Sequence, residues 1–168
     1  MTSSLRSPRL RQRRKDDLER CVAVLREVHD ADGYPLTWPA DPARWLTPAG
    51  LLDAWVAMDG HGAILGHVLL ARTEQAAGPV AEVGRLFVAP QARRQAVGRR
   101  LVEHALIVAD DQRMPLVLEV VDGDSAASAM YEATGWRLTH ISTADWTGPN
   151  GEAVRLRHYR SPIGSADA

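Results

Sequence analysis

The hydrophobic and polar positions of the chain change period at one place, where a strand pattern gives way to a helix pattern. Residues 80–88 have the β-branched and aromatic bias of a strand, and Pro90, which cannot donate to a ladder hydrogen bond, should end it. From Ala96 onward, apolar residues recur every three or four positions, the period of one helix face. The residues with this period are Val97, Leu101, Ala105 and Val108.

The loop between these two elements predicts a phosphate site. Arg93 and Arg94 supply positive charge, and the small residues Ala96 and Gly98 would let an anion approach the main chain. A helix begins with unpaired N–H groups and a partial positive charge, so its N-terminus can hold a phosphate or pyrophosphate.

The remaining pattern predicts a single α/β domain over residues 9–161, with disordered tails at 1–8 and 162–168. The apolar run 116–121 is typical of a central strand covered on both faces, and the strand–helix–strand succession implies that it runs parallel to 80–88. Helices are expected after Asp16 or Asp17, from Ala96, and from Asp124 to a stop at Gly135. The other strands are expected at 9–13, 54–58, 63–70, 137–145 and 153–160.

Composition narrows the function classes. A length of 168 residues suits one domain with a core, and a net charge of −1 argues against a general polyanion binder. Residues 6–15 are basic but have no interleaved aromatic residue, so we interpret them as a solvated strand rather than a nucleic-acid site. Cys21, the only cysteine, lies on an apolar helix face and is interpreted as a core residue. The absence of a long apolar run predicts a cytoplasmic protein with no membrane partner.

The proline-broken stretch 32–47 contains Tyr34, Trp38 and Trp45. These aromatic residues have two interpretations. They either close the end of the core, which is common for tryptophan, or line the wall of a pocket for an apolar part of a ligand. The sequence does not decide between them.

Two segments resemble the signatures of the GNAT superfamily, the acyl-coenzyme-A-dependent N-acyltransferases. Residues 86–98 (LFVAPQARRQAVG) resemble the family's pyrophosphate signature Arg/Gln-x-x-Gly-x-Gly/Ala, and residues 124–136 (DSAASAMYEATGW) resemble its Asn-x-x-Ala-x-x-Leu-Tyr-Glu-x-x-Gly-Phe. Two positions depart from the family pattern. Ala96 replaces a glycine, which costs nothing if the position is helical, and Asp124 replaces an asparagine.

The resemblance implies a mixed sheet of about seven strands with splayed parallel central strands and flanking helices. It also implies transfer of an acetyl group from acetyl-CoA to a primary amine, directly and in a ternary complex, with no metal. Main-chain groups of the arginine loop would hold the pyrophosphate, and those of Leu86 and Val88 the pantetheine arm. The coenzyme-binding residues so implied are Leu86, Phe87, Val88, Arg93, Arg94, Gln95, Ala96, Val97, Gly98, Arg99, Asp124 and Tyr131.

Within this resemblance, Tyr131 is the expected general acid for the leaving thiolate, and its alternative is a helix residue that only packs on the coenzyme. Glu82 is the candidate base, on a strand face shared with Leu86 and Val88 if side chains alternate. Its alternative is a structural carboxylate paired to Arg85 or Arg72. Glu119 is the second choice for the base and is placed at the acceptor site, unless it is a buried structural group.

The acceptor is the open question of the resemblance. Tyr34, Trp38, Trp45 and Trp55 favour a small molecule with an apolar part, while a peptide N-terminus or a lysine side chain would also fit. A homodimer through the last two strands is compatible with the family. The alternative function is a non-catalytic sensor of acyl-CoA.

Overall fold

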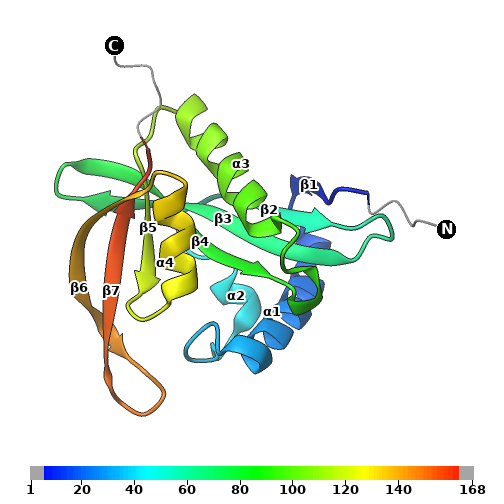
Figure 1. Cartoon of the computed structure of the whole chain (residues 1–168), viewed down its shortest axis with the longest axis horizontal. Helices are drawn as coiled ribbons and strands as arrows, with labels where there is room; N and C mark the ends of the chain where they lie inside the picture. Colours follow the sequence, from blue (N-terminus) through cyan, green and yellow to red (C-terminus); the bar gives the residue numbers. More distant parts are fainter. Residues whose placement is uncertain (1–5, 163–168) are drawn as a thin grey trace.

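A seven-stranded sheet forms the centre of the molecule (Figure 1). The computed structural model describes residues 6–162. The strand order is β1-β2-β3-β4-β5-β7-β6, and all neighbours are antiparallel except β4 and β5. The strands are β1 (Arg9–Gln12), β2 (Leu51–Met58), β3 (Ile64–Gln75), β4 (Gly78–Val88), β5 (Leu116–Val121), β6 (Arg137–Thr147) and β7 (Ala153–Arg160). The expected mixed sheet, with β4 parallel to β5, is confirmed.

The helices also follow the expected order. They are α1 (Leu18–Asp32), the short α2 (Pro42–Trp45), α3 (Val97–Asp111) and α4 (Ser125–Ala133), with 3-10 turns at Lys15–Asp17 and Pro90–Ala92. Asp124 caps α4, because its carboxylate accepts a hydrogen bond from the N–H of Ala127 at 3.2 Å. Gly135 follows the end of α4 with a φ of 92°, a left-handed conformation that suits glycine.

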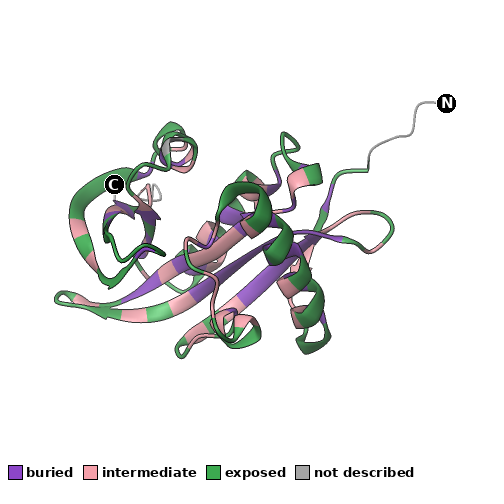
Figure 2. Ribbon diagram, turned by 90° about the horizontal axis from the view of Figure 1, so that it is seen from below, coloured by how far each residue is buried: buried purple, intermediate pink, exposed green. Residues whose placement is uncertain are grey.

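The helices cover the sheet on two faces. A Cβ added to Gly66 of β3 would meet the side chains of Val97 and Leu101, so this face lies under α3. The β3 residues with the opposite orientation face α1. Figure 2 shows buried strand segments at the centre of the molecule and exposed helix surfaces around them. Cys21 is fully buried on α1, as expected for a core residue, and burial raises the pKa of its thiol to about 11.

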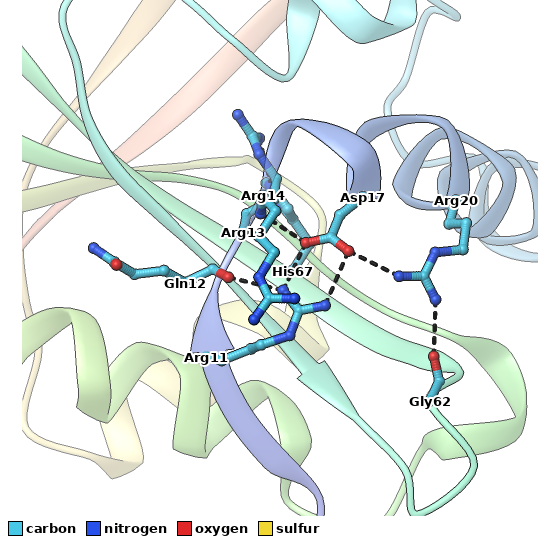
Figure 3. Close-up of polar contacts among 8 residues, drawn as sticks. All are labelled: Arg11, Gln12, Arg13, Arg14, Asp17, Arg20, Gly62 and His67. Carbon is cyan, nitrogen blue, oxygen red and sulfur yellow. Dashed lines mark hydrogen bonds and ion pairs between the residues drawn. The ribbon is translucent and has the colours of Figure 1, made fainter.

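A buried carboxylate ties β1 to the start of α1 (Figure 3). The side chain of Asp17 is only 2% exposed and accepts hydrogen bonds from the guanidinium groups of Arg11 (2.7 and 3.0 Å) and Arg20 (2.8 Å) and from the Arg14 N–H (2.7 Å). The bonds from Arg11 hold the pKa of Asp17 well below its usual range.

This cluster corrects the interpretation of the N-terminal basic run as a solvated strand. Arg11 holds Asp17, and Arg13 is half-buried against α2 and β3. Pro8, at the end of the predicted tail, is buried, and its carbonyl accepts a hydrogen bond from Arg100 at 2.6 Å. The rest of both predicted tails, residues 1–5 and 163–168, lies outside the described residues. No described helix is both long enough and apolar enough to cross a membrane.

Candidate active site

The two central strands β4 and β5 pair over only three residues and then separate. Within the described residues, the last ladder pair is Val83 beside Leu118, although β4 continues to Val88 and β5 to Val121. The main-chain groups of β4 that would continue the ladder with β5 are therefore available. A ligand in an extended conformation can bind there as an added strand would.

A β-bulge in β4 lies at the point of separation. Between the register pairs Leu69–Gly84 and His67–Phe87, β4 holds one residue more than β3. Arg85, inside the bulge, adopts the left-handed conformation with a φ of 51°. Because a bulge bends its strand and increases the local twist, it explains why β4 leaves β5 at this position.

The bulge also corrects the predicted faces of β4. Strict alternation placed Glu82 on the same face as Leu86 and Val88, but the extra residue shifts the pattern by one. Val88 lies against α3, where a Cβ added to Gly98 would meet its side chain at 3.4 Å. Glu82 lies on the other face, the one that α1 and α2 cover.

A buried histidine holds the bulge in place. His67 is fully buried, its Nδ1 lies 2.9 Å from the carbonyl oxygen of Arg85, and its Nε2 lies 2.9 Å from Nη1 of Arg13 (Figure 3 shows His67 beside Arg13). A carbonyl only accepts and a guanidinium only donates, so Nδ1 carries the proton and the ring is neutral. Burial lowers the pKa of His67 to about 4, which keeps it neutral at physiological pH.

The loop from β4 to α3 is exposed and leads into the N-terminus of helix α3. Arg94, Gln95 and Ala96 are exposed, and the first N–H groups of the 15-residue α3, from Val97 to Arg99, have no intrahelical partner. Together with the helix dipole they can bind an anion.

The arginines of this loop differ in what they contact. The guanidinium of Arg93 forms a two-point ion pair with Asp32 at the end of α1, and Arg99 pairs with Glu103 at 2.9 Å. Among the described residues, no ion-pair partner lies within 4 Å of Arg94. The charge of Arg94 is therefore the one in the loop that is free to meet an anion.

Alanine in place of the family's glycine at position 96 was expected to cost nothing if the position were helical. Ala96 is not helical. It lies just before α3 with φ 57° and ψ 23°, in the left-handed region. An L-residue there has its Cβ close to the following carbonyl oxygen, at a cost of about 1–2 kcal/mol. The left-handed conformation therefore explains why the family has glycine at this position, and the alanine of this chain is strained there.

Glu82 and Glu119 face a cavity of about 210 Å³ on the face that carries α1 and α2. Glu82 is beside Val117 in the ladder, and Glu119 follows two residues later on the same side of β5. Burial, and then the charge of Glu119, raise the pKa of Glu82 to about 7, against a smaller opposite effect of Arg85. A carboxylate with this pKa can accept a proton from a substrate near neutral pH.

The sequence left a purely structural role open for both carboxylates: an ion pair with an arginine for Glu82, and burial for Glu119. The structure shows neither. Arg72 pairs with Glu74 at 3.2 Å, and among the described residues no cation forms an ion pair within 4 Å of Glu82. The side chain of Glu119 is 40% exposed, so it is not a buried structural group.

Beside Glu119, β7 and β6 contribute a histidine pair. Nδ1 of His158 lies 3.6 Å from a carboxylate oxygen of Glu119, and its Nε2 lies 2.6 Å from the hydroxyl of Ser142. The rings of His158 and His140 stack with centroids 4.0 Å apart. Burial lowers the pKa of His158, and His140 adds to this against the opposing charge of Glu119, so His158 is neutral at pH 7.

Tyr131 lies on the opposite face, on α4. It is 5% exposed and packs against Trp136 and Tyr159 with ring centroids 5.7 and 6.2 Å away. Burial, followed by Tyr34 and Asp124, raises the pKa of Tyr131 well above its usual value, so the phenol stays protonated at neutral pH. No described residue forms a hydrogen bond with its hydroxyl, which is thus available to a ligand.

The three aromatic residues of the proline-rich segment lie at two different sites. Tyr34 packs edge-on against Trp45, and the guanidinium of Arg85 lies 4.1 Å above the Trp45 ring. These residues lie beside the bulge, and burial raises the pKa of Tyr34 to about 12. Trp38 instead packs on α1, with the guanidinium of Arg26 4.4 Å above its ring.

Trp55 does not belong to an aromatic wall. It is 3% exposed on β2 and packs edge-on against His104 of α3, with ring centroids 5.1 Å apart. It is a core residue on the opposite face from Glu82. A second cavity of about 550 Å³ lies on this face between α3 and α4 and includes Arg99, Met130 and Trp136 in its lining.

Sequence reasoning missed several residues of the site. His158, His140 and Arg160 line the cavity of Glu82, and Arg85 lies at the bulge. His158 and Arg160 alternate along β7 and so share one face, which was a detectable signal. Nothing in the sequence indicated that this face would lie next to β5.

Comparisons with known proteins agree with this geometry. Residues 15–136 match the family model described as Acetyltransferase (GNAT) family. A peptidyl-lysine N-acetyltransferase, YjaB of Salmonella typhimurium, is 28% identical over 145 residues, which cover 83% of this chain and 90% of that protein.

Solved structures share the fold at low sequence identity. The crystal structure of a putative phosphinothricin N-acetyltransferase superposes with a TM-score of 0.75 at 20% identity, covering 95% of this chain and all of that one. The structure of Arabidopsis thaliana NAA60 in complex with acetyl-CoA superposes with a TM-score of 0.71 at 16% identity, covering 91% and 97%.

Proposed function

Because the chain belongs to the Acetyltransferase (GNAT) family and is an N-acetyltransferase, we propose that it transfers an acetyl group from acetyl-CoA directly to a primary amine bound in the cavity of Glu82 and Glu119. The observation that carries this proposal is the position of Glu82. A carboxyl group with a pKa of about 7 faces a cavity at the end of the paired part of β4 and β5. Glu82 serves as the base.

The residues around the β4–α3 loop fit a coenzyme with a pyrophosphate. The N–H groups of Val97 to Arg99 and the guanidinium of Arg94 would hold the pyrophosphate. Gly98 lets α3 lie close to Val88. The cavity between α3 and α4 is open for the distal part of the same ligand. When bound, acetyl-CoA supplies the activated acetyl thioester.

The roles of the acid and the base follow from the two faces of the sheet. The acceptor amine reaches the site as an ammonium ion beside Glu82 and Glu119, and Glu82 takes its proton. Glu119 provides a second carboxylate beside the bound acceptor. From the other face, the protonated Tyr131 hydroxyl donates a hydrogen bond at the position of the leaving sulfur. The transfer takes place where β4 and β5 are no longer paired, beyond Val83 and Leu118.

The burial and the raised pKa of Cys21 support direct transfer without a covalent acetyl-enzyme. Cys21 is fully buried on α1, and its raised pKa of about 11 leaves it a thiol rather than a nucleophilic thiolate. A covalent acetyl-cysteine step through Cys21 therefore has no support.

For the acceptor we favour a small amine. The cavity of about 210 Å³ suits a group of that size, and Tyr34 and Trp45 supply apolar surface beside the bulge. The likeness to a peptidyl-lysine N-acetyltransferase keeps a lysine side chain as the second candidate, because its butylamine end also fits a cavity of this volume.

The test is an initial-rate study of thiol release with small primary amines and, in parallel, lysine-containing peptides. Both substrates are varied together. Intersecting double-reciprocal lines support a ternary complex, and parallel lines contradict it. A higher kcat/KM for peptides than for any small amine would reverse the choice of acceptor. Absence of thiol release with every amine would overturn the proposal.

A further inference from the structure

The cavity of Glu82 carries opposite charges at its two ends. Glu82 on β4, Val117 on β5 and Arg160 on β7 are consecutive register neighbours across three strands and lie on one face of the sheet. Both Glu82 and Arg160 line the cavity. Two strand spacings separate their Cα atoms by roughly 10 Å. The two carboxylates thus lie on β4 and β5, and Arg160 lies on β7, toward the β6 edge.

A second arginine extends the positive end. Arg137 on β6 is the register partner of Arg160, so the two arginines are next to each other on neighbouring strands and on the same face of the sheet. Both residues are exposed, and neither forms an ion pair with another described residue within 4 Å. Like charges directly opposite each other destabilise a sheet. An anion bound between the two arginines would offset this repulsion. Arginine pairs suit a carboxylate or phosphate, which they bind through two parallel N–H···O bonds.

The middle of the cavity does not change this charge pattern. Apart from Glu82, Glu119 and Arg160, the polar groups that line the cavity are His158 on β7, His140 and Thr139 on β6, and the neutral Gln75 on β3. His158 is neutral at pH 7 and Glu119 is at the carboxylate end. The cavity therefore runs from negative to positive charge.

We propose that the acceptor is a zwitterionic small molecule whose amine binds at Glu82 and Glu119 and whose carboxylate or other anionic group binds at Arg160 and Arg137. This inference rests on the proposed function, because it identifies the class of amine that the same site acetylates. An ω-amino acid or a short peptide has the required separation of charges, while a simple alkylamine lacks the anionic group.

The experiment compares three acceptors with the same carbon chain: 6-aminohexanoate, hexylamine and 1,6-diaminohexane. For the wild type we expect kcat/KM for 6-aminohexanoate to exceed that for hexylamine by roughly 10- to 100-fold, the worth of hydrogen bonds to a charged group. Arg160→Gln should remove this preference, and Arg160→Glu should favour the diamine instead. Arg155→Gln is the matched control, since Arg155 lies on the same strand with the opposite orientation.

Calorimetric binding of 6-aminohexanoate to the wild type and Arg160→Gln is measured alongside the rates. Equal kcat/KM values for the three acceptors in the wild type, or a preference that survives Arg160→Gln, would overturn the inference while leaving the acetyltransferase function intact. If no amine is acetylated, the calorimetric binding of 6-aminohexanoate tests the inference by itself. Binding that is lost in Arg160→Gln supports the inference, and only the proposed function fails. Equal binding to both proteins overturns the inference.

Discussion

Glu82 should make the protein less stable, because its ionised form is unfavourable in the folded site. Its pKa is about 7 in the fold, against an ordinary value of 4.5 for the unfolded chain. At about 1.4 kcal/mol for each pH unit between the two values, the ionised side chain costs the folded state about 3 kcal/mol. Below pH 4.5 Glu82 is protonated in both states and costs nothing. The cost grows as the pH rises through 4.5 to 7 and is constant above that.

Replacing Glu82 with Gln should therefore stabilise the protein by an amount that depends on pH. Urea unfolding at pH 4.5, 6 and 8 measures the free energy of unfolding of wild type and Glu82→Gln. We expect a difference that is small at pH 4.5 and increases to about 2–3 kcal/mol in favour of the variant at pH 8. The same variant should lose activity, as expected for a functional group that costs stability.

Glu119→Gln serves as the control for the cause of this effect. Burial is the first cause of the raised pKa of Glu82 and the charge of Glu119 is the second. Removing that charge should lower the pKa of Glu82 only in part, so the pH dependence should shrink without disappearing. A stability difference between wild type and Glu82→Gln that does not change with pH would refute the reasoning.

Three further predictions concern other residues. Tyr131→Phe should lower kcat by roughly 10²- to 10⁴-fold in a thiol-release assay and leave acetyl-CoA binding by calorimetry unchanged; weakened binding would favour a packing role. Ala96→Gly should raise the free energy of unfolding in urea by about 1 kcal/mol, because glycine adopts the left-handed conformation without strain. The control Ala23→Gly, at an exposed position of α1, should lower it by about 1 kcal/mol. A change of the same sign in both variants would contradict the strain at Ala96. Asp17→Asn should cost about 3 kcal/mol at pH 7. The cost should fall progressively below pH 4, because the unfolded chain protonates Asp17 there while the folded carboxylate, with its lowered pKa, stays ionised. An equal loss with Asp16→Asn would show that the buried ion pairs are not the cause.

The strand and helix pattern could be predicted because it depends on local periodicity. The change from the β4 pattern to the α3 pattern, the Asp124 cap and the apolar run of β5 are each visible within a dozen residues. These signals also sufficed for the parallel pairing of β4 with β5, because a strand–helix–strand connection leaves little alternative.

The bulge at Arg85 could not be predicted, and it changed the face that the following β4 residues, Leu86 to Val88, occupy relative to Glu82. The register shift arises from contacts across the sheet, where His67 of β3 and Arg13 after β1 fix the Arg85 carbonyl. No local pattern in β4 reports these contacts. The burial of Trp55 on the α3 face, away from Glu82, likewise depends on register across strands.

The sequence-based prediction of the polar residues of the site was incomplete for the same reason. Asp17 has the residue type and position of a helix cap, but the structure directs its carboxylate to arginines instead. The cavity of Glu82 combines residues from five strands, and only the sheet order brings His158 and Arg160 beside β5. Sequence reasoning identified the two carboxylates from their strands, but not the positive charge opposite them.

The role of Glu82 as the base is tested most directly by the rate of acetyl transfer to an amine in Glu82→Gln and wild type at saturating acetyl-CoA and pH 7. We expect the variant to form the acetylated amine roughly 10²- to 10⁴-fold more slowly, with an unchanged dissociation constant for acetyl-CoA. Equal rates in the two proteins would contradict the account, because Glu82 would then not take the proton of the acceptor.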